Sequence, residues 1–257
     1  MRHLLVTFVA SLVLISAASA ADGKKVSIRW HGQSFFEIKT SAGTRIVLDP
    51  HAIEAYGRHD VEADLILISH LHNDHTQVGV ITNFKPANLR LGLKEPNGDV
   101  KRAEWNQIDE QIKDVHIKTV GVYHDAMEGM QRGKNAVFII ETDGIRIAHL
   151  GDLGHVLNAS TVKKIGPVDV LLIPVGGVYT INGAEAKQVV EQLKPKQFIV
   201  PMHYGTKVYE DLLPVDEFLD EQKKEYVKKY ESNELIVEAG ANPPEPTIVV
   251  LNWKSKK

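Results

Sequence analysis

The sequence predicts an α/β fold in which β-sheets are covered by helices. Two runs, Leu65–Ser69 and Val168–Pro174, are mainly apolar, as expected for strands that are buried on both faces. Asn182 is followed three positions on by Glu185, the pattern of a capping box, and the helix should continue to about Leu193. Strands and helices of this kind bury their apolar faces by packing in layers. The hydrophobic pattern alone does not decide between one sheet and two.

The first part of the chain is expected to consist mainly of strands. Asp143-Gly144 is typical of a two-residue hairpin turn between two of them. A short helix is expected over Gln77–Phe84, directly after a cluster of histidines. The other strands predicted here are 26–30, 34–38, 45–48, 89–93, 115–122, 136–141 and 145–150.

The second part of the chain mixes helices with short strands. Helices are expected over Val156–Ile165 and Val215–Tyr230, besides the helix that begins after Asn182. Lysines alternate with Glu and apolar residues around 223–229, which favours a solvated helix face over a binding patch. The strands predicted here, besides the apolar run at 168–174, are 198–201, 236–237 and 247–251.

The N-terminus has the pattern of a secretory signal peptide. Met1–His3 is a short basic start, Leu4–Ile15 is apolar, and Ala18–Ala20 is a small-residue cleavage site. We therefore predict a signal peptide at 1–20, one domain at 21–257, and a periplasmic or secreted location. The apolar stretch is short for a membrane span, so no stable span is expected after cleavage.

The Cys content and the charge of the chain limit the kinds of partner expected for this domain. The chain has 257 residues, a formal net charge of −3 and no Cys. It therefore folds without disulfides and lacks the Cys needed for bacterial lipid attachment. Because positive and negative charges nearly balance and no long basic run occurs, nucleic acid is not expected as a partner. A small-molecule substrate is the expected partner, and the sequence leaves the oligomeric state open.

One short segment concentrates metal-ligand chemistry. His70-Leu71-His72-Asn73-Asp74-His75 places four such side chains within six positions, directly after the apolar run at 65–69. The end of a buried strand holds backbone positions rigidly, and a tight loop there can point several side chains at bound ions. A His-rich surface loop is a weaker explanation, because His is uncommon and usually scattered.

Three further predicted strands end at similar side chains. His124 follows 115–123, Asp152 follows 145–150, and His203 follows 198–202. Ligands at the ends of separate strands are how a rigid scaffold builds one site. Imidazole nitrogen and carboxylate oxygen without thiolate suit Zn²⁺, with Mn²⁺ or Fe²⁺ as alternatives.

In order and spacing these residues resemble the metallo-β-lactamase-fold hydrolases. The matching features are H-x-H-x-D-H at 70–75, then His124, Gly151-Asp152 and His203. The segments 30–35 and 48–50 resemble the branch that contains ascorbate-6-phosphate lactonase-like and N-acyl-phosphatidylethanolamine phospholipase D-like enzymes. That branch often has Gly-His-Ser where this chain has Gly32-Gln33-Ser34, so the role of that His is not carried over to His31.

The resemblance implies a four-layer αββα sandwich with a site for two divalent metal ions along one edge of its sheets. The ligands it implies are His70, His72 and His124 for the first ion, Asp74, His75 and His203 for the second, and Asp152 between the two. Two cations about 3.5–4 Å apart lower the pKa of a shared water, and the resulting hydroxide is a nucleophile at neutral pH. The implied function is a metal-dependent hydrolase that cleaves an ester, lactone or phosphoester bond.

Several further residues are candidates for roles near this site. Asp74 is expected to orient the nucleophile as well as to bind metal. His155 is a proton donor to the leaving group, a residue that supports the site from behind the ligands, or a surface residue at the start of a helix. Tyr179 is a candidate substrate contact, since its loop lies between a buried strand and a helix. Asp49 either supports the site or forms a turn before Pro50, and His149 is expected to pack in the sheet or bond the backbone.

Two other functions remain open at this point. Hydrolysis of β-lactams suits a periplasmic location, but the resemblance associates a bridging Asp with other hydrolases, and lactamases with a Cys ligand are excluded. A di-iron redox or metal-binding protein of the same fold is the second alternative. Such proteins often have Glu where this chain has His72, and they usually work with a flavin domain for which this chain is too short.

Overall fold

The computed structural model describes residues 23–94 and 103–254. The signal peptide predicted at 1–20 lies outside these residues. The strands of the first sheet are β1 (Lys25–Trp30), β2 (Phe36–Lys39), β3 (Arg45–Leu48), β4 (Leu65–Ile68), β5 (Leu89–Leu91) and β13 (Glu234–Glu238). Those of the second are β6 (Asp109–Ile112), β7 (Val115–Tyr123), β8 (Lys134–Thr142), β9 (Ile145–His149), β10 (Val170–Pro174), β11 (Phe198–Met202), β12 (Val227–Lys229) and β14 (Thr247–Val250).

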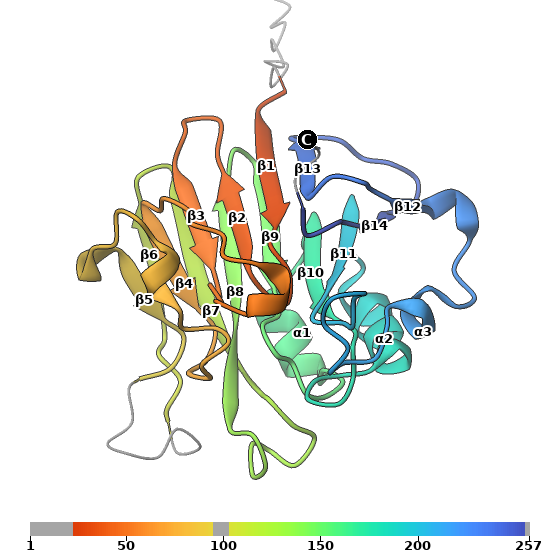
Figure 1. Ribbon diagram of the computed structural model, residues 1–257. Coiled ribbons are helices and arrows are strands. Elements are labelled where there is room, and N and C mark those ends of the chain that lie inside the picture. Colours follow the sequence, from red (N-terminus) through yellow and green to blue (C-terminus); the bar gives the residue numbers. More distant parts are fainter. Residues whose placement is uncertain (1–22, 95–102, 255–257) are drawn as a thin grey trace, which may run out of the picture.

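The two sheets pack against each other and enclose the main core (Figure 1). Their strand orders are β13-β1-β2-β3-β4-β5 and β12-β14-β11-β10-β9-β8-β7-β6. β4 is buried on both faces, because Leu65 and Leu67 belong to the main core while Ile66 and Ile68 pack in a second cluster with Val80. This explains why the segment is continuously apolar in the sequence. Full burial of each such side chain stabilises the fold by about 1.5–3 kcal/mol.

The α-helices lie together at one end of the molecule (Figure 1). They are α1 (Ala159–Ile165), α2 (Gly183–Leu193) and α3 (Asp216–Leu219). The predicted capping box is present: Asn182 Oδ1 accepts from the Glu185 N–H at 2.9 Å, and Glu185 Oε2 accepts from the Asn182 N–H at 3.0 Å. Over the first sheet, the described residues form 3₁₀ turns at Glu54–Tyr56, Val78–Val80 and Pro86–Asn88. The predicted sandwich of sheets and helices is confirmed, with one outer layer thinner than expected.

The helix predicted over Val215–Tyr230 is wrong. Only α3 is α-helical, Glu221 takes a left-handed backbone conformation (φ 64°), and a 3₁₀ turn at Lys224–Tyr226 leads into β12, where Val227 pairs with Ile248 of β14. Like charges at i and i+4 oppose a longer helix here, since Asp216 faces Asp220 and Glu217 faces Glu221 in that register. The sheet pairing of the following segment then determines its conformation.

Two smaller differences concern the other predicted helices. Gln77–Phe84 contains only the 3₁₀ turn η2 (Val78–Val80), because Ile81 makes a bridge to Val61. The first α-helix begins at Ala159 rather than Val156, with the Asn158 side chain as its N-terminal cap. Within the described residues, no helix combines the length and apolarity that crossing a membrane requires.

The sheet topology brings the predicted ligands to one edge. β9, β10 and β11 are parallel, and β7 shares their direction because β8 runs antiparallel to both β7 and β9. In the first sheet β3 and β4 are parallel, and β1 runs the same way because β2 is antiparallel to both β1 and β3. The segments that leave the carboxyl ends of these strands contain every predicted ligand.

Candidate metal centre

The predicted ligands form two groups at this edge. The ligand atoms of His70, His72 and His124 all lie within 4.8 Å of one another. Those of Asp74, His75 and His203 meet the same limit. The structure therefore brings together both triads that the resemblance implied. That they bind metal stays a prediction.

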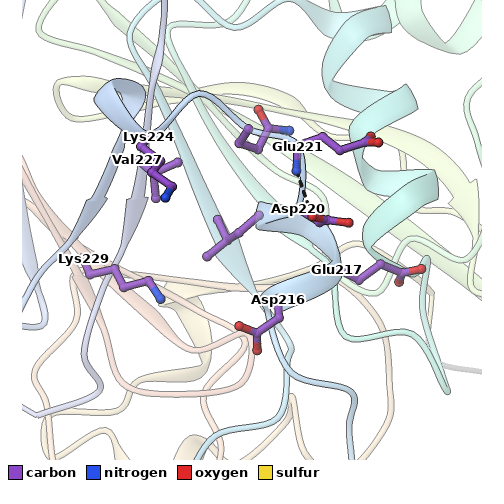
Figure 2. A pocket seen from close by; sticks show the side chains of 9 residues that line it. Asp216, Glu217, Asp220, Glu221, Lys224, Val227 and Lys229 are labelled. Atoms are coloured by element: carbon purple, nitrogen blue, oxygen red, sulfur yellow. Dashed lines mark hydrogen bonds between the residues drawn. The ribbon is translucent and has the colours of Figure 1, made fainter.

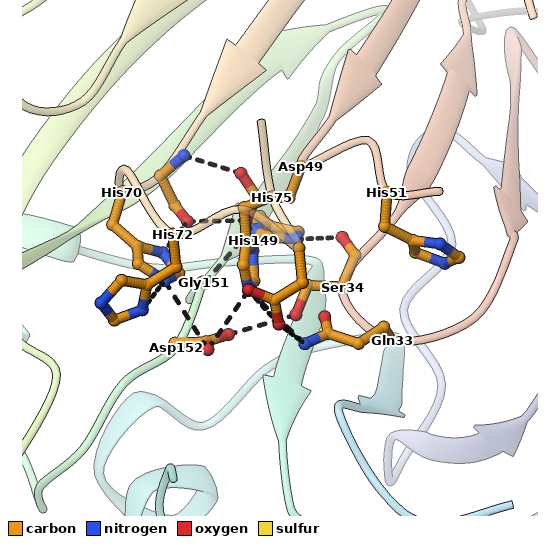
Figure 3. A network of polar contacts seen from close by, with 12 residues as sticks. Gln33, Ser34, Asp49, His51, His70, His72, His75, His149, Gly151 and Asp152 are labelled. Atoms are coloured by element: carbon orange, nitrogen blue, oxygen red, sulfur yellow. Dashed lines mark hydrogen bonds and ion pairs between the residues drawn. The ribbon is translucent and has the colours of Figure 1, made fainter. Parts of the chain in front are cut away.

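Asp152 lies between the two groups, and Figure 3 shows it beside His70, His72 and His75. Its Oδ2 atom faces Nε2 of His203 at 3.1 Å, of His124 at 3.2 Å, of His75 at 3.3 Å and of His70 at 3.8 Å. Its Oδ1 atom accepts a hydrogen bond from Ser34 Oγ at 3.3 Å. Burial raises the pKa of Asp152, but the charges of His203 and His75 outweigh burial and hold that pKa well below its ordinary value. An ionised oxygen that faces both groups has the position expected of a bridging ligand.

The protonation of the imidazoles fits a bound cation. Burial holds the pKa of His70 well below its ordinary value and lowers that of His72 to about 4, so both rings are neutral and keep a lone pair for a metal. Burial also lowers the pKa of His75, but Asp152 and Asp49 outweigh it and raise that pKa well above its ordinary value. The carboxylates of Asp152 and Asp49 thus favour a positive charge next to the His75 ring. Nitrogen and oxygen donors that enclose such a point fit a divalent cation.

Asp49 supports one ring of each group. Its Oδ1 accepts from the Ser69 N–H at 2.7 Å, and its Oδ2 accepts from Ser69 Oγ at 2.6 Å and lies 3.1 Å from His75 Nδ1. Because the Ser69 hydroxyl proton is used in that bond, Ser69 Oγ accepts from His70 Nδ1 at 2.9 Å. This leaves the Nε2 lone pair of His70 directed at Asp152. Of the two interpretations of Asp49, the structure supports the one in which it supports the site.

Two further imidazoles, those of His124 and His203, lack this support. Nδ1 of His124 and Nδ1 of His203 are buried without a hydrogen-bond partner among the described residues. Their backbones are instead held by close packing. A Cβ atom added at Gly154 would lie 2.2 Å from the His124 carbonyl carbon, and one at Gly176 would lie 2.2 Å from the His203 carbonyl oxygen. Only glycine fits at these two contacts.

Gln33 contacts a ligand where related proteins often have His. Its Nε2 donates to Asp74 Oδ2 at 2.8 Å, and its side chain is buried. His31 instead lies against Glu37, with Nε2 3.6 Å from Oε2. Burial raises the pKa of Asp74, but the hydrogen bond and charge of His75 outweigh it and lower that pKa to about 2. The departure from the Gly-His-Ser pattern therefore lies in direct contact with the centre.

A cavity of about 290 Å³ opens onto the centre. It is lined by His72, Asp74, His124, Arg132, Asp152, Tyr179 and His203. Tyr179 thus lies where the sequence predicted a substrate contact, and its role there stays a prediction. Arg132 was missed, because it belongs to a loop without any recognisable motif.

A larger cavity of about 850 Å³ lies elsewhere, between α3 and β12 (Figure 2). It is lined by charged side chains such as Asp216, Glu217, Lys224 and Lys229, and no His lines it. Function is better located by converging chemical groups than by size. We therefore assign the functional site to the smaller cavity.

The structure gives no support to the interpretation of His155 as a proton donor. Its Nε2 accepts from the Tyr123 N–H at 3.1 Å, and its Nδ1 donates to the Val156 carbonyl at 2.9 Å. Both nitrogens are used by the backbone, and the residue does not line the cavity at the centre. The ring instead fastens the loop after Asp152 to the end of β7.

His149 bonds the backbone, as expected. Its Nε2 donates to the Ser34 carbonyl at 3.0 Å, and its Nδ1 accepts from the Gly151 N–H at 3.1 Å. It therefore joins the segment after β1 to the segment after β9. The rigidity of the centre depends on such contacts between the two sheets.

Comparison with known proteins agrees with this fold. Residues 27–203 match a family model described as a beta-lactamase superfamily domain. The chain is 34% identical over 197 residues to a UPF0173 metal-dependent hydrolase of Thermococcus onnurineus, covering 70% of this chain and 85% of the relative. A Myxococcus xanthus relative with the same description is 32% identical over 212 residues, covering 74% of each chain.

A solved structure gives the same result. It is a metallo-β-lactamase superfamily protein of Thermotoga maritima, with a TM-score of 0.65 and 36% identity over 88% of this chain and 98% of that one. The chain therefore belongs to the metallo-β-lactamase superfamily. Within that class it is a metal-dependent hydrolase, like the relatives it matches. The lactonase- and phospholipase-like branch stays a prediction, because these descriptions name no substrate.

Proposed function

We propose that this hydrolase works with two divalent cations. His70, His72 and His124 would hold one ion, Asp74, His75 and His203 would hold the other, and Asp152 would lie between them. We expect Zn²⁺, with Mn²⁺ or Fe²⁺ as alternatives that depend on supply. The observation that supports this most strongly is the convergence of four imidazole nitrogens on Asp152 Oδ2, at 3.1–3.8 Å.

The bound cations would lower the pKa of a shared water to generate a nucleophile and would stabilise negative charge in the transition state. The residues of the chain supply orientation. Gln33 holds Asp74 through Oδ2, which leaves Oδ1 of Asp74 without a hydrogen bond among the described residues and able to accept one from the attacking water. Asp49 and Ser69 fix the rings of His75 and His70.

We propose esters, lactones and phosphoesters of small molecules as substrates. The cavity of about 290 Å³ is small, which favours a small molecule over a macromolecule. The nearly balanced charge of the chain gives no support for nucleic acid binding. We further propose that residues 1–20 are removed as a signal peptide and that the mature protein is periplasmic or secreted. Sequencing the N-terminus of the protein from its native host tests this directly.

Metal content and turnover test the proposed reaction together. The purified protein should bind two metal equivalents and hydrolyse at least one generic ester, lactone or phosphodiester, and chelation should abolish turnover. His72→Ala should lose turnover, whereas His116→Ala should retain it, because His116 pairs with Asp109 and Glu141 outside the cavity. Nitrocefin in the same screen tests the β-lactam alternative. Full activity after complete metal removal would exclude the proposal.

A further inference from the structure

Arg132 has unused hydrogen-bonding capacity beside the metal centre. It lines the same cavity as His72, Asp74 and Tyr179 and is half-buried. Its guanidinium makes one hydrogen bond, from Nη2 to the Val178 carbonyl at 3.2 Å, and its Cζ lies 5.2 Å from the centre of the Tyr179 ring. Among the described residues, no ion pair of Arg132 with a carboxylate is found, and its side-chain contacts are those with Val178 and Tyr179. A guanidinium has five N–H donors, so most of them are available to a ligand.

The backbone of Arg132 is held in place by a buried carboxylate. Asp125 directly follows the predicted ligand His124 and accepts four backbone hydrogen bonds. The donors are Met127 at 2.8 Å, Gly129 at 3.0 Å, Gln131 at 3.0 Å and Arg132 at 2.7 Å. The same strand end therefore positions a predicted metal ligand and the loop that bears the arginine. Such preorganisation is what a recognition residue requires.

The charge of the site favours an anionic partner. Two divalent cations carry more charge than the carboxylates Asp74 and Asp152 neutralise, so a loaded cavity is positive even before Arg132 is counted. A guanidinium matches a carboxylate or phosphate through two parallel N–H···O bonds. Its stacking on Tyr179 orients the planar group without using these donors.

We propose that Arg132, oriented by Tyr179, recognises an anionic group of the substrate, either a carboxylate or a phosphate. This inference rests on the proposed function of the same site. A purely structural role is the competing explanation, since Arg132 also links its loop to the loop of Val178. The two explanations differ in one respect: only recognition makes the effect of a substitution depend on the charge of the substrate.

Matched substrates distinguish the two explanations. Para-nitrophenyl hemisuccinate and para-nitrophenyl butyrate share a leaving group and differ by a carboxylate. Arg132→Gln should lower kcat/KM for the hemisuccinate about 10- to 100-fold more than for the butyrate, mainly through KM, as expected for a lost charge-assisted bond. Arg132→Lys should fall between. Arg58→Gln is the control for net charge, because Arg58 pairs with Asp60 away from the cavity. Bis(para-nitrophenyl) phosphate in the same assays distinguishes a phosphoester from a distant carboxylate.

A binding measurement separates this inference from the proposed reaction. Phenylphosphonate binding to the zinc-loaded protein is measured by calorimetry, with zinc content determined for each variant. Arg132→Gln should weaken binding about tenfold at unchanged zinc content. If no substrate is hydrolysed but this loss occurs, the proposed reaction fails, while the role of Arg132 in binding an anion at this site stands. If turnover is metal-dependent and Arg132→Gln shows neither substrate selectivity nor weaker phenylphosphonate binding, the inference is overturned and the reaction stands.

Discussion

Two parts of the site differ in how firmly they are held: the edge of the sheets that carries the predicted metal ligands, and the rim of the cavity, which is formed by Arg132 and Tyr179. At the edge, His75 is fully buried and its ring lies between Asp49 and Asp152. At the rim, Tyr179 is 45% exposed, and its loop contacts Arg132 through one hydrogen bond and ring stacking. The edge is built from strand ends of both sheets, whereas the rim consists of loops. We therefore expect the reaction chemistry to reside in the buried part and substrate choice to reside in the loops.

The largest effect on metal content and turnover should come from replacing Asp152, which lies at the centre of the predicted ligands. Asp152→Ala removes the oxygen that faces four imidazoles, so we expect loss of metal. Turnover should fall by more than about 100-fold, because replacing a residue that only supports a metal ligand already costs about 10- to 100-fold. Elemental analysis and an ester assay measure both. Asp109→Ala, an exposed carboxylate on β6, is the control. Retention of both metals and of turnover would contradict the bridging role.

Acid should destabilise the fold through His51, whose Nε2 lies 3.2 Å from the carbonyl oxygens of His31 and Gly32. Burial lowers the pKa of His51 to about 4, and its Nδ1 accepts from the Ile53 N–H at 3.1 Å. Because the unfolded chain binds the proton more tightly, the stabilisation is complete above about pH 6.5 and is lost as the pH falls toward 4, by about 3 kcal/mol in all. Urea unfolding of the chelated protein at several pH values measures the slope. His51→Gln should flatten it, and an unchanged slope would refute this role.

A smaller effect is expected from Asp49, which supports ligands without facing the cavity. Asp49→Asn keeps the size of the side chain but weakens the orientation of His75 and Ser69, so metal affinity should fall about 10- to 100-fold. Competition with a coloured zinc chelator measures the change. Circular dichroism verifies that the variant is folded. Unaltered affinity in a folded variant would mean that Asp49 serves only the turn before Pro50.

The smallest effect should come from the hydroxyl of Tyr179. No hydrogen bond of that hydroxyl to another described residue is found, and only the ring contacts Arg132. Tyr179→Phe should therefore change kcat/KM by less than about threefold, since it keeps the stacking. A loss of kcat/KM above tenfold on every substrate would instead indicate that the Tyr179 hydroxyl takes part in the reaction.

Residue type and spacing were enough to predict which ligand-type side chains meet at the edge of the sheets, but not which residues line the rim of the cavity. The His70–His75 motif, His124, Asp152 and His203 could be recognised because metal chemistry depends on residue type and strand ends can be predicted from apolar runs. His155 has the same residue type, but the sequence does not reveal that both of its nitrogens bond the backbone. Arg132 has no local signal, since it reaches the cavity through the fold of its loop around Asp125.

The same limit applies to the secondary structure. β4, β10 and α2 were predicted because burial and capping leave local patterns in the sequence. The segment Val215–Tyr230 was not, because its conformation depends on the pairing of Val227 with Ile248, a partner that is distant in the chain. The Lys, Glu and apolar residues at 223–229 favour a helix locally, and the pairing with β14 overrides that preference.

The most direct test is a crystal structure of the zinc-loaded protein with anomalous scattering recorded at the zinc edge. Two peaks on either side of Asp152 are expected, one bound by His70, His72 and His124 and the other by Asp74, His75 and His203. A single peak, or peaks away from Asp152, would contradict the dinuclear centre on which the proposed reaction depends.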